Sequence, residues 1–151
     1  MANKDDFLAT VDKSGFLTTS YVKRVPKPWG FELHLLPEGG PYMMKVLHIN
    51  QGARLSMQAH DAKSESWIVH SGRAGVILEN AAGELQEIEL KPGEGYTSQI
   101  GQRHRLYGIT DCEVVEASTP ELGTTWRLED DYARPDETEE LRKDPNRGWN
   151  G

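Results

Sequence analysis

The sequence predicts an all-β domain, folded as a barrel or a sandwich. From Tyr42 to Ala117 it is a series of short runs rich in valine, isoleucine and leucine, separated by turn residues at near-regular intervals. Residues 42–117 show no 3.6-residue apolar period sustained over three turns, which a long amphipathic helix would require. Both observations favour strands over helices.

The expected strands follow one another in chain order. Prolines and glycines precede the first apolar segment, 31–36, and a second break of the same kind at 37–41 ends it. Within 85–90, Ile88 and Leu90 lie on one face, while the glutamates between them lie on the other, as in a half-exposed strand. The remaining strands are expected at 42–49, 54–58, 67–72, 74–79, 105–109 and 112–117.

The two ends of the chain differ from its centre. Residues 1–20 are polar and are expected to form a loose arm or an edge strand, before a domain at 21–134. Residues 135–151 are charged and poor in aliphatic side chains, which favours a solvated tail with a short helix around 137–143. Docking of Trp149 on the domain or on a partner chain is the alternative.

Composition restricts the classes of function. A length of 151 residues fits one domain, and a net charge of -7 argues against a general nucleic-acid binder. Neither a signal-peptide core at the start nor an apolar run of membrane-spanning length is visible. Cys112 is the single cysteine, which excludes an intrachain disulfide and favours a reducing compartment. We therefore expect a cytoplasmic protein without membrane or nucleic-acid partners.

Four side chains could hold a metal ion together. Gln58 and His60 are two residues apart, so they share one face of an extended segment, and Glu65 follows after a short loop. His104 follows a glycine turn that can direct its ring towards the same point. One carboxylate, one amide oxygen and two imidazoles suit zinc, our first choice, or manganese, iron, cobalt or nickel. We assign His34, His48 and His70 to surface or packing roles.

Several motifs together resemble the cupin superfamily, and in particular the type II mannose-6-phosphate isomerases. The segment RLSMQAH at 54–60 resembles the family's RLSLQ-x-H, in which glutamine replaces the usual first cupin histidine. Further similar segments are KPWG at 27–30, HRL at 104–106, Glu116, and RLEDDY at 127–132. The resemblance covers residues 23–134 and implies a cupin double-stranded β-helix, a jelly-roll barrel that binds a divalent metal.

The sequence also departs from that family's pattern. Gln99 replaces the usual proline of the second cupin motif, and Asp61, Ala62 and Ser66 stand where related domains carry a histidine-rich cluster. Such domains often form the C-terminal part of bifunctional mannose-1-phosphate guanylyltransferases. This chain is more similar to small free-standing members, so metal binding carries over better than the substrate.

The resemblance implies a metal-dependent aldose–ketose isomerase that acts on a sugar or sugar phosphate through a metal-stabilised enediolate. Candidate catalytic residues are Lys45, which interrupts the apolar strand 42–49, and Glu116 and Arg105, with Glu32 as a further possible base. Lys45 could instead extend to solvent from an edge strand. Arg105 follows a ligand and should point away from the metal unless a bulge intervenes. Arg54 and Trp29 are candidates for substrate binding.

Two other functions fit the same residues. One is a non-catalytic, metal-containing cupin that binds a small polar or sugar ligand, and the other is a metal-dependent dioxygenase. We also expect a homodimer, in which the N-terminal arm could add a strand across the interface.

Overall fold

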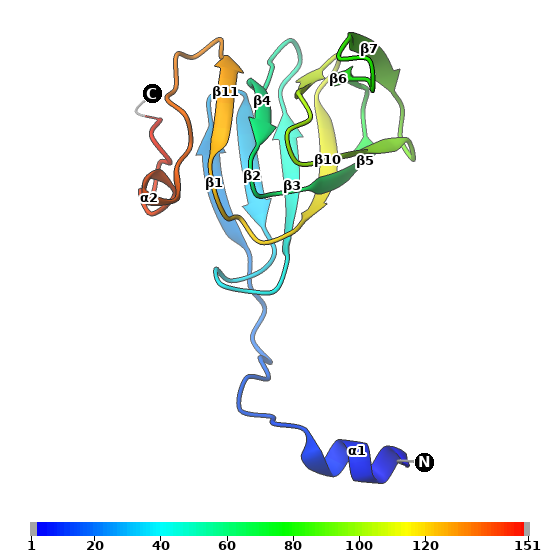
Figure 1. Ribbon diagram of the computed structural model, residues 1–151, viewed down its shortest axis with the longest axis vertical. Helices are drawn as coiled ribbons and strands as arrows, with labels where there is room; N and C mark the ends of the chain where they lie inside the picture. The colour runs from blue at the N-terminus through cyan, green and yellow to red at the C-terminus, as the bar shows by residue number, and fades with distance from the viewer. Residues whose placement is uncertain (1–2, 150–151) are drawn as a thin grey trace.

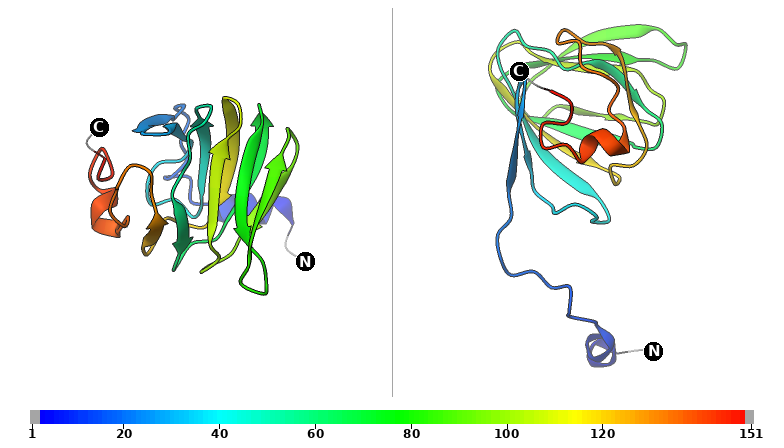
Figure 2. Two further views of the ribbon diagram at one scale, coloured as in Figure 1. Left: turned by 90° about the horizontal axis from the view of Figure 1, so that it is seen from above. Right: turned by 90° about the vertical axis from the view of Figure 1, so that its left-hand side faces the viewer.

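The computed structural model describes residues 3–149 and contains two antiparallel β-sheets that face each other (Figures 1 and 2). The six-stranded sheet has the spatial order β1 (Lys23–Lys27), β2 (Gly30–His34), β3 (Met43–Ile49), β10 (Cys112–Ser118), β5 (Glu65–Ser71) and β8 (Gly95–Ser98). The five-stranded sheet has the order β11 (Thr125–Glu129), β4 (Met57–His60), β9 (His104–Gly108), β6 (Ala74–Glu79) and β7 (Leu85–Leu90).

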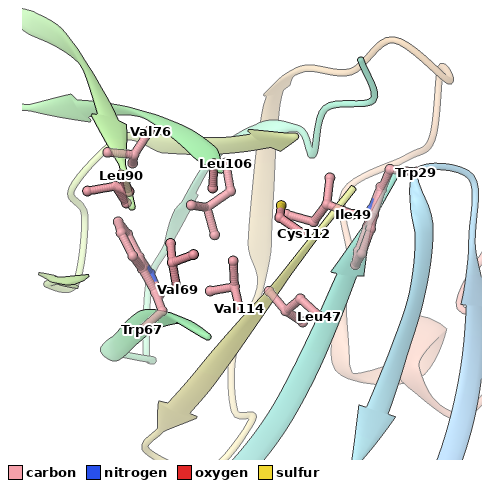
Figure 3. Close-up of a cluster of buried hydrophobic side chains, with 11 residues drawn as sticks. Trp29, Leu47, Ile49, Trp67, Val69, Val76, Leu90, Leu106, Cys112 and Val114 are labelled. Carbon is pink, nitrogen blue, oxygen red and sulfur yellow. The ribbon is translucent and has the colours of Figure 1, made fainter. Parts of the chain in front are cut away.

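Alternation along the strands separates an apolar end of the barrel from a charged end. On β3, Lys45, Leu47 and Ile49 all point inward, and Leu47 pairs with Val114 of β10. Figure 3 shows these aliphatic side chains packing towards Val76, Leu90 and Leu106 of the other sheet. Trp67 belongs to this core. The next inward pair along β3 and β10 is Lys45 with Glu116, so the interior becomes charged at this end.

The N-terminal arm contains a helix that the sequence analysis did not anticipate. Helix α1 (Lys4–Thr10) begins where the Asn3 side chain accepts hydrogen bonds from the backbone of Asp5 and Asp6, each at 2.9 Å. The edge-strand alternative is therefore wrong for this segment. The arm extends from β1 and holds α1 away from the barrel (Figure 1). Residues 1 and 2 of the expected arm lie outside the described residues.

The C-terminal segment folds back over the charged end of the barrel. Helix α2 (Glu139–Arg142) lies within the predicted helix, and Thr138 caps its N-terminus. Residue Glu137 exchanges backbone hydrogen bonds with Thr125 at 2.9 and 3.0 Å. Both Glu137 and Arg147 are buried, so the prediction of a solvated tail is wrong at these positions. The prediction failed because ion pairs with residues far away in the sequence match these charges. Positions 150–151 of the predicted tail lie outside the described residues.

None of the helices within residues 3–149 is long and apolar enough to span a membrane.

Candidate metal centre

Three predicted ligands meet inside the charged end of the barrel. His60 ends β4, Glu65 begins β5 and His104 begins β9, and one ligand atom from each lies within 4.8 Å of the others. The Nε2 atom of His104 is 2.9 Å from Glu65 Oε1, and that of His60 is 3.4 Å from Glu65 Oε2. All three side chains are buried, and no other group of this kind occurs in residues 3–149.

Hydrogen bonds at the far side of each ring direct both histidines towards this point. His104 Nδ1 is 2.9 Å from the carbonyl oxygen of Gln102, which can only accept, so Nδ1 carries the proton and Nε2 keeps a free lone pair. Ser98 Oγ lies 2.8 Å from the same Nδ1 atom. Thr125 Oγ1 holds His60 Nδ1 at 3.0 Å. Such outer hydrogen bonds orient imidazoles that bind metals.

The potential ligand atoms of His60 and Glu65 are better satisfied by a cation between them than by each other. His60 Nε2 is buried and has no hydrogen-bond partner among the described residues, a costly arrangement unless something binds there. Burial lowers the pKa of His60, which favours the neutral ring that a metal requires. Burial alone would raise the pKa of Glu65, but the charge of Lys63 holds it well below its usual value, so the carboxylate stays charged.

Gln58 is placed to complete the set. It pairs with His104 across β4 and β9, and its Nε2 atom lies 3.4 Å from His104 Nε2, while Oε1 accepts a hydrogen bond from Ser56 at 2.8 Å. Rotating the amide by half a turn exchanges these atoms, placing the oxygen towards the cluster and the nitrogen on the Ser56 hydroxyl. His60, Glu65 and His104 therefore surround one point, with the Gln58 amide beside it, and the binding of an ion by these four residues stays a prediction.

A second layer of charged groups surrounds the cluster, and sequence reasoning missed two of its members, Lys63 and Glu121. Lys63 Nζ lies 3.0 Å from Glu65 Oε2 and 3.6 Å from Glu116 Oε1. Burial, together with the charge of Glu65, raises the pKa of Glu116 to about 8. Lys45 lies 3.5 Å from Glu32 and also pairs with Glu121. Lys63 could have been found, because it lies two positions before Glu65, in the short loop between the ligands His60 and Glu65.

Around these groups lies a small internal cavity of about 50 Å³, enough for a few water molecules. Besides three of the predicted ligands, namely Gln58, His60 and Glu65, its lining includes Trp29, Lys45, Lys63, Glu116, Glu121, Glu137 and Arg147. The last two of these come from the C-terminal segment. The metal cluster therefore faces a small cavity whose wall is formed partly by the tail.

Two sequence candidates do not reach this cavity. Arg105 points to the other side of β9, where it donates to the carbonyl of Leu55 at 2.9 Å and pairs with Glu129 at 3.3 Å. Arg54 forms an exposed ion pair with Asp131, at 2.6 Å. Both arginines connect the barrel to the segment after β11, and this arrangement does not place them against a ligand. Alternation along the strand explains Arg105, because its neighbour His104 points inward.

The fold is that of a cupin, as comparison with solved structures shows. The capsular polysaccharide assembling protein CapF from Staphylococcus aureus superposes with a TM-score of 0.61 and 17% identity, over 73% of this chain and 35% of that chain. Oxalate decarboxylase from Bacillus subtilis gives a TM-score of 0.62 and 14% identity, over 76% of this chain and 33% of that one. At such low identity, these likenesses establish the cupin barrel and nothing about activity.

The chain belongs to the mannose-6-phosphate isomerase C-terminal family, whose model matches residues 16–136. The alginate biosynthesis protein AlgA of Pseudomonas aeruginosa is 33% identical over 82% of this chain and 26% of its own length. The xanthan biosynthesis protein XanB of Xanthomonas campestris is 28% identical over 85% of this chain and 27% of its own length. Mannose-1-phosphate guanylyltransferase 2 of Escherichia coli O157:H7 is 31% identical over 79% of this chain and 23% of its own length. The chain thus spans about a quarter of these relatives, and the resemblance stated above is confirmed.

Proposed function

We propose that this chain is a metal-dependent aldose–ketose isomerase that acts on a sugar phosphate. The observation that carries the proposal is the cluster of His60, Glu65 and His104, which shares one cavity with Lys45 and Glu116. Membership of the mannose-6-phosphate isomerase C-terminal family, and a relative named for alginate biosynthesis, support a sugar substrate. Gln58 and the three clustered residues would hold the ion, which, when bound, acts as a Lewis acid that stabilises negative charge on substrate oxygens.

Glu116 is the proton-transfer group of this proposal. It lines the cavity, and its Oε1 atom is buried without a hydrogen-bond partner among the described residues, so one carboxylate oxygen remains available. In its ionised form, Glu116 would accept the proton from the carbon beside the substrate carbonyl and return it to the carbonyl carbon, while a second proton passes from the substrate hydroxyl oxygen to the carbonyl oxygen. Lys63, 3.6 Å away, would hold the carboxylate in place. Lys45 stays protonated beside Glu121 and Glu32, and would stabilise negative charge on the substrate.

The experiment is a direct assay after metal loading. Purified protein is analysed for its metal content, supplied with zinc or manganese, and tested by ³¹P NMR for interconversion of mannose 6-phosphate and fructose 6-phosphate. Interconversion that disappears with a chelator supports the proposal. Full metal occupancy without turnover of any hexose phosphate would refute it and favour the non-catalytic binding protein. The cavity volume of about 50 Å³ is the observation that favours this second function. The choice of zinc and a cytoplasmic location stay predictions.

We further infer that two copies of the chain associate through the N-terminal arm. Among the described residues, no hydrogen bond or ion pair joins 3–22 to the barrel, although this arm exposes Phe7, Phe16 and Leu17 by 64%, 63% and 75%. The right-hand view of Figure 2 shows the same separation. Large apolar side chains gathered on one segment are unfavourable in water and mark an interaction surface.

The outer face of the six-stranded sheet offers a matching surface. Leu33, Val46, Val115 and Ile68 are successive partners across β2, β3, β10 and β5, and form an apolar row on the face opposite the core. The arm continues from β1 at the edge of the same sheet. An arm of about 20 residues laid on this row approaches the roughly 20–30 residues a side of a specific interface. The occupant we propose is the arm of a second copy.

Sedimentation equilibrium is expected to give twice the chain mass of 17.0 kDa. Deleting residues 1–22 should give a monomer, and Ile68→Asp should weaken association at least about tenfold, because it places a charge within the apolar row. Leu128→Asp is the matched control, since Leu128 is similarly exposed but lies on β11 of the other sheet. A 17.0 kDa particle for the intact chain would refute the dimer.

A further inference from the structure

Glu121 occupies a position between two buried cations. Its carboxylate pairs with Lys45 Nζ, and it accepts from Arg147 Nη2 at 3.1 Å and from Arg147 Nη1 at 3.4 Å. The side chains of Lys45 and Arg147 are only 5% and 4% exposed. Cations buried to this degree are stable only with an anion beside them. Together they form a preformed anion site, and the protein's own carboxylate fills it.

The segment that carries Glu121 is less regular than the strand that carries Lys45. Lys45 lies within β3, paired on both sides, and Arg147 is held by Glu137 at 3.5 Å as well as by Glu121. Glu121 instead lies in the irregular connection between β10 and β11, and its neighbour Leu122 is 57% exposed. Connecting segments of this kind move more readily than the strands they join.

The Glu121–Arg147 pair also separates two cavities. Both residues line the internal cavity of about 50 Å³ and a second, outer cavity of about 220 Å³. Tyr42, Arg142 and Lys143 contribute to the outer cavity, which opens beside α2. Pockets for small molecules usually enclose about 300–1,000 Å³, so neither cavity alone is large enough. Moving Glu121 aside would connect them and create a route to the metal cluster.

Charge balance favours an anion as the group that replaces Glu121. Apart from Arg134, which Asp130 neutralises, the internal cavity is lined by five cations and five carboxylates. The cations are Lys27, Lys45, Lys63, Arg127 and Arg147, and the carboxylates are Glu32, Glu65, Glu116, Glu121 and Glu137. Withdrawing one carboxylate leaves an unmatched cation in a buried space, and a phosphate group entering from outside would neutralise it.

We propose that Lys45 and Arg147 form the binding site for a ligand phosphate, and that this phosphate enters by displacing Glu121. The C-terminal segment thereby supplies a ligand-binding arginine from beyond residues 16–136, the part that matches the family. The identity of the ligand as a sugar phosphate rests on the proposed function, whereas the anion site itself does not.

Binding of inorganic phosphate to the full chain tests the site without turnover. Isothermal titration at constant ionic strength, adjusted with chloride, compares the wild type with Glu121→Gln, which keeps the shape of the side chain and removes the competing charge. The variant is expected to bind phosphate at least about tenfold more tightly. Its melting temperature should fall in phosphate-free buffer, because two buried cations lose their anion, and recover when phosphate is added.

Two further variants make the result decisive. Arg147→Met, alone or together with Glu121→Gln, should weaken phosphate binding at least about tenfold. Glu89→Gln removes an ion-paired carboxylate on β7, at 2.6 Å from Arg73 and outside both cavities, and should change nothing. Equal phosphate affinity of the wild type and Glu121→Gln, or a gain that survives Arg147→Met, would overturn the proposal. If Glu121→Gln does not fold, a phosphate affinity of Arg147→Met equal to that of the wild type would also overturn the proposal. Failure of isomerisation with phosphate binding intact would refute only the proposed function.

Discussion

His60→Ala and His104→Ala are each expected to lose the bound metal, with affinity falling by more than about 100-fold. Loss of an outer hydrogen bond to a ligand already costs about 10–100-fold, and removal of the ligand itself must cost more. Each histidine contributes a ligand atom within 4.8 Å of the other donors, and no third histidine belongs to this group among the described residues. The measurement is elemental analysis of protein loaded with zinc and then passed through a desalting column.

His34→Ala is the matched control. His34 is as deeply buried as the two ligands and is hydrogen-bonded to Glu32 Oε2 at 2.7 Å, so its loss disturbs the interior to a similar degree. It does not line the cavity around the cluster, and one metal per chain should remain. Equal metal content in all three variants, with circular dichroism showing that each is folded, would refute the ligand assignment.

Glu116→Gln is expected to reduce isomerisation by about 10²–10⁴-fold while the metal remains bound, which is the usual contribution of a positioned acid–base group. The amide has nearly the same shape as the carboxylate but cannot accept the proton. The variant should also lose exchange of the substrate's C2 hydrogen with deuterium from solvent, which ¹H NMR measures independently of net turnover.

Glu113→Gln provides the comparison on the same strand. Glu113 lies on the outer face of β10, 3.7 Å from His48, and its replacement should leave both turnover and exchange unchanged. Full activity in Glu116→Gln would remove Glu116 from the mechanism. Loss of the metal together with the activity would show that Glu116 supports the cluster rather than moving a proton.

The strands and the shared direction of the Gln58 and His60 side chains could be read from the sequence because both depend on local patterns. Alternation places Lys45 inward beside Leu47 and Ile49, and the two-residue spacing of Gln58 and His60 directs both side chains to one side. Family motifs then supplied the barrel, which no local pattern determines.

Other features depend on contacts that local patterns do not contain. The tail appeared solvated because its charges are dense, yet Glu137 meets Lys27 at 4.0 Å and Arg127 at 3.1 Å, and Arg147 meets Glu121. Ion pairs between residues so far apart in the chain leave no periodic signal. The helix in the arm was missed for a different reason, because its N-cap at Asn3 precedes a segment too short to show a period.

Anomalous diffraction from a metal-loaded crystal tests the central claim most directly. Data collected on both sides of the zinc absorption edge should give one peak per chain, about 2 Å from His60 Nε2, His104 Nε2 and a carboxylate oxygen of Glu65, with the amide oxygen of Gln58 facing it. A peak at another place, or fully loaded crystals with no peak between these side chains, would contradict the account.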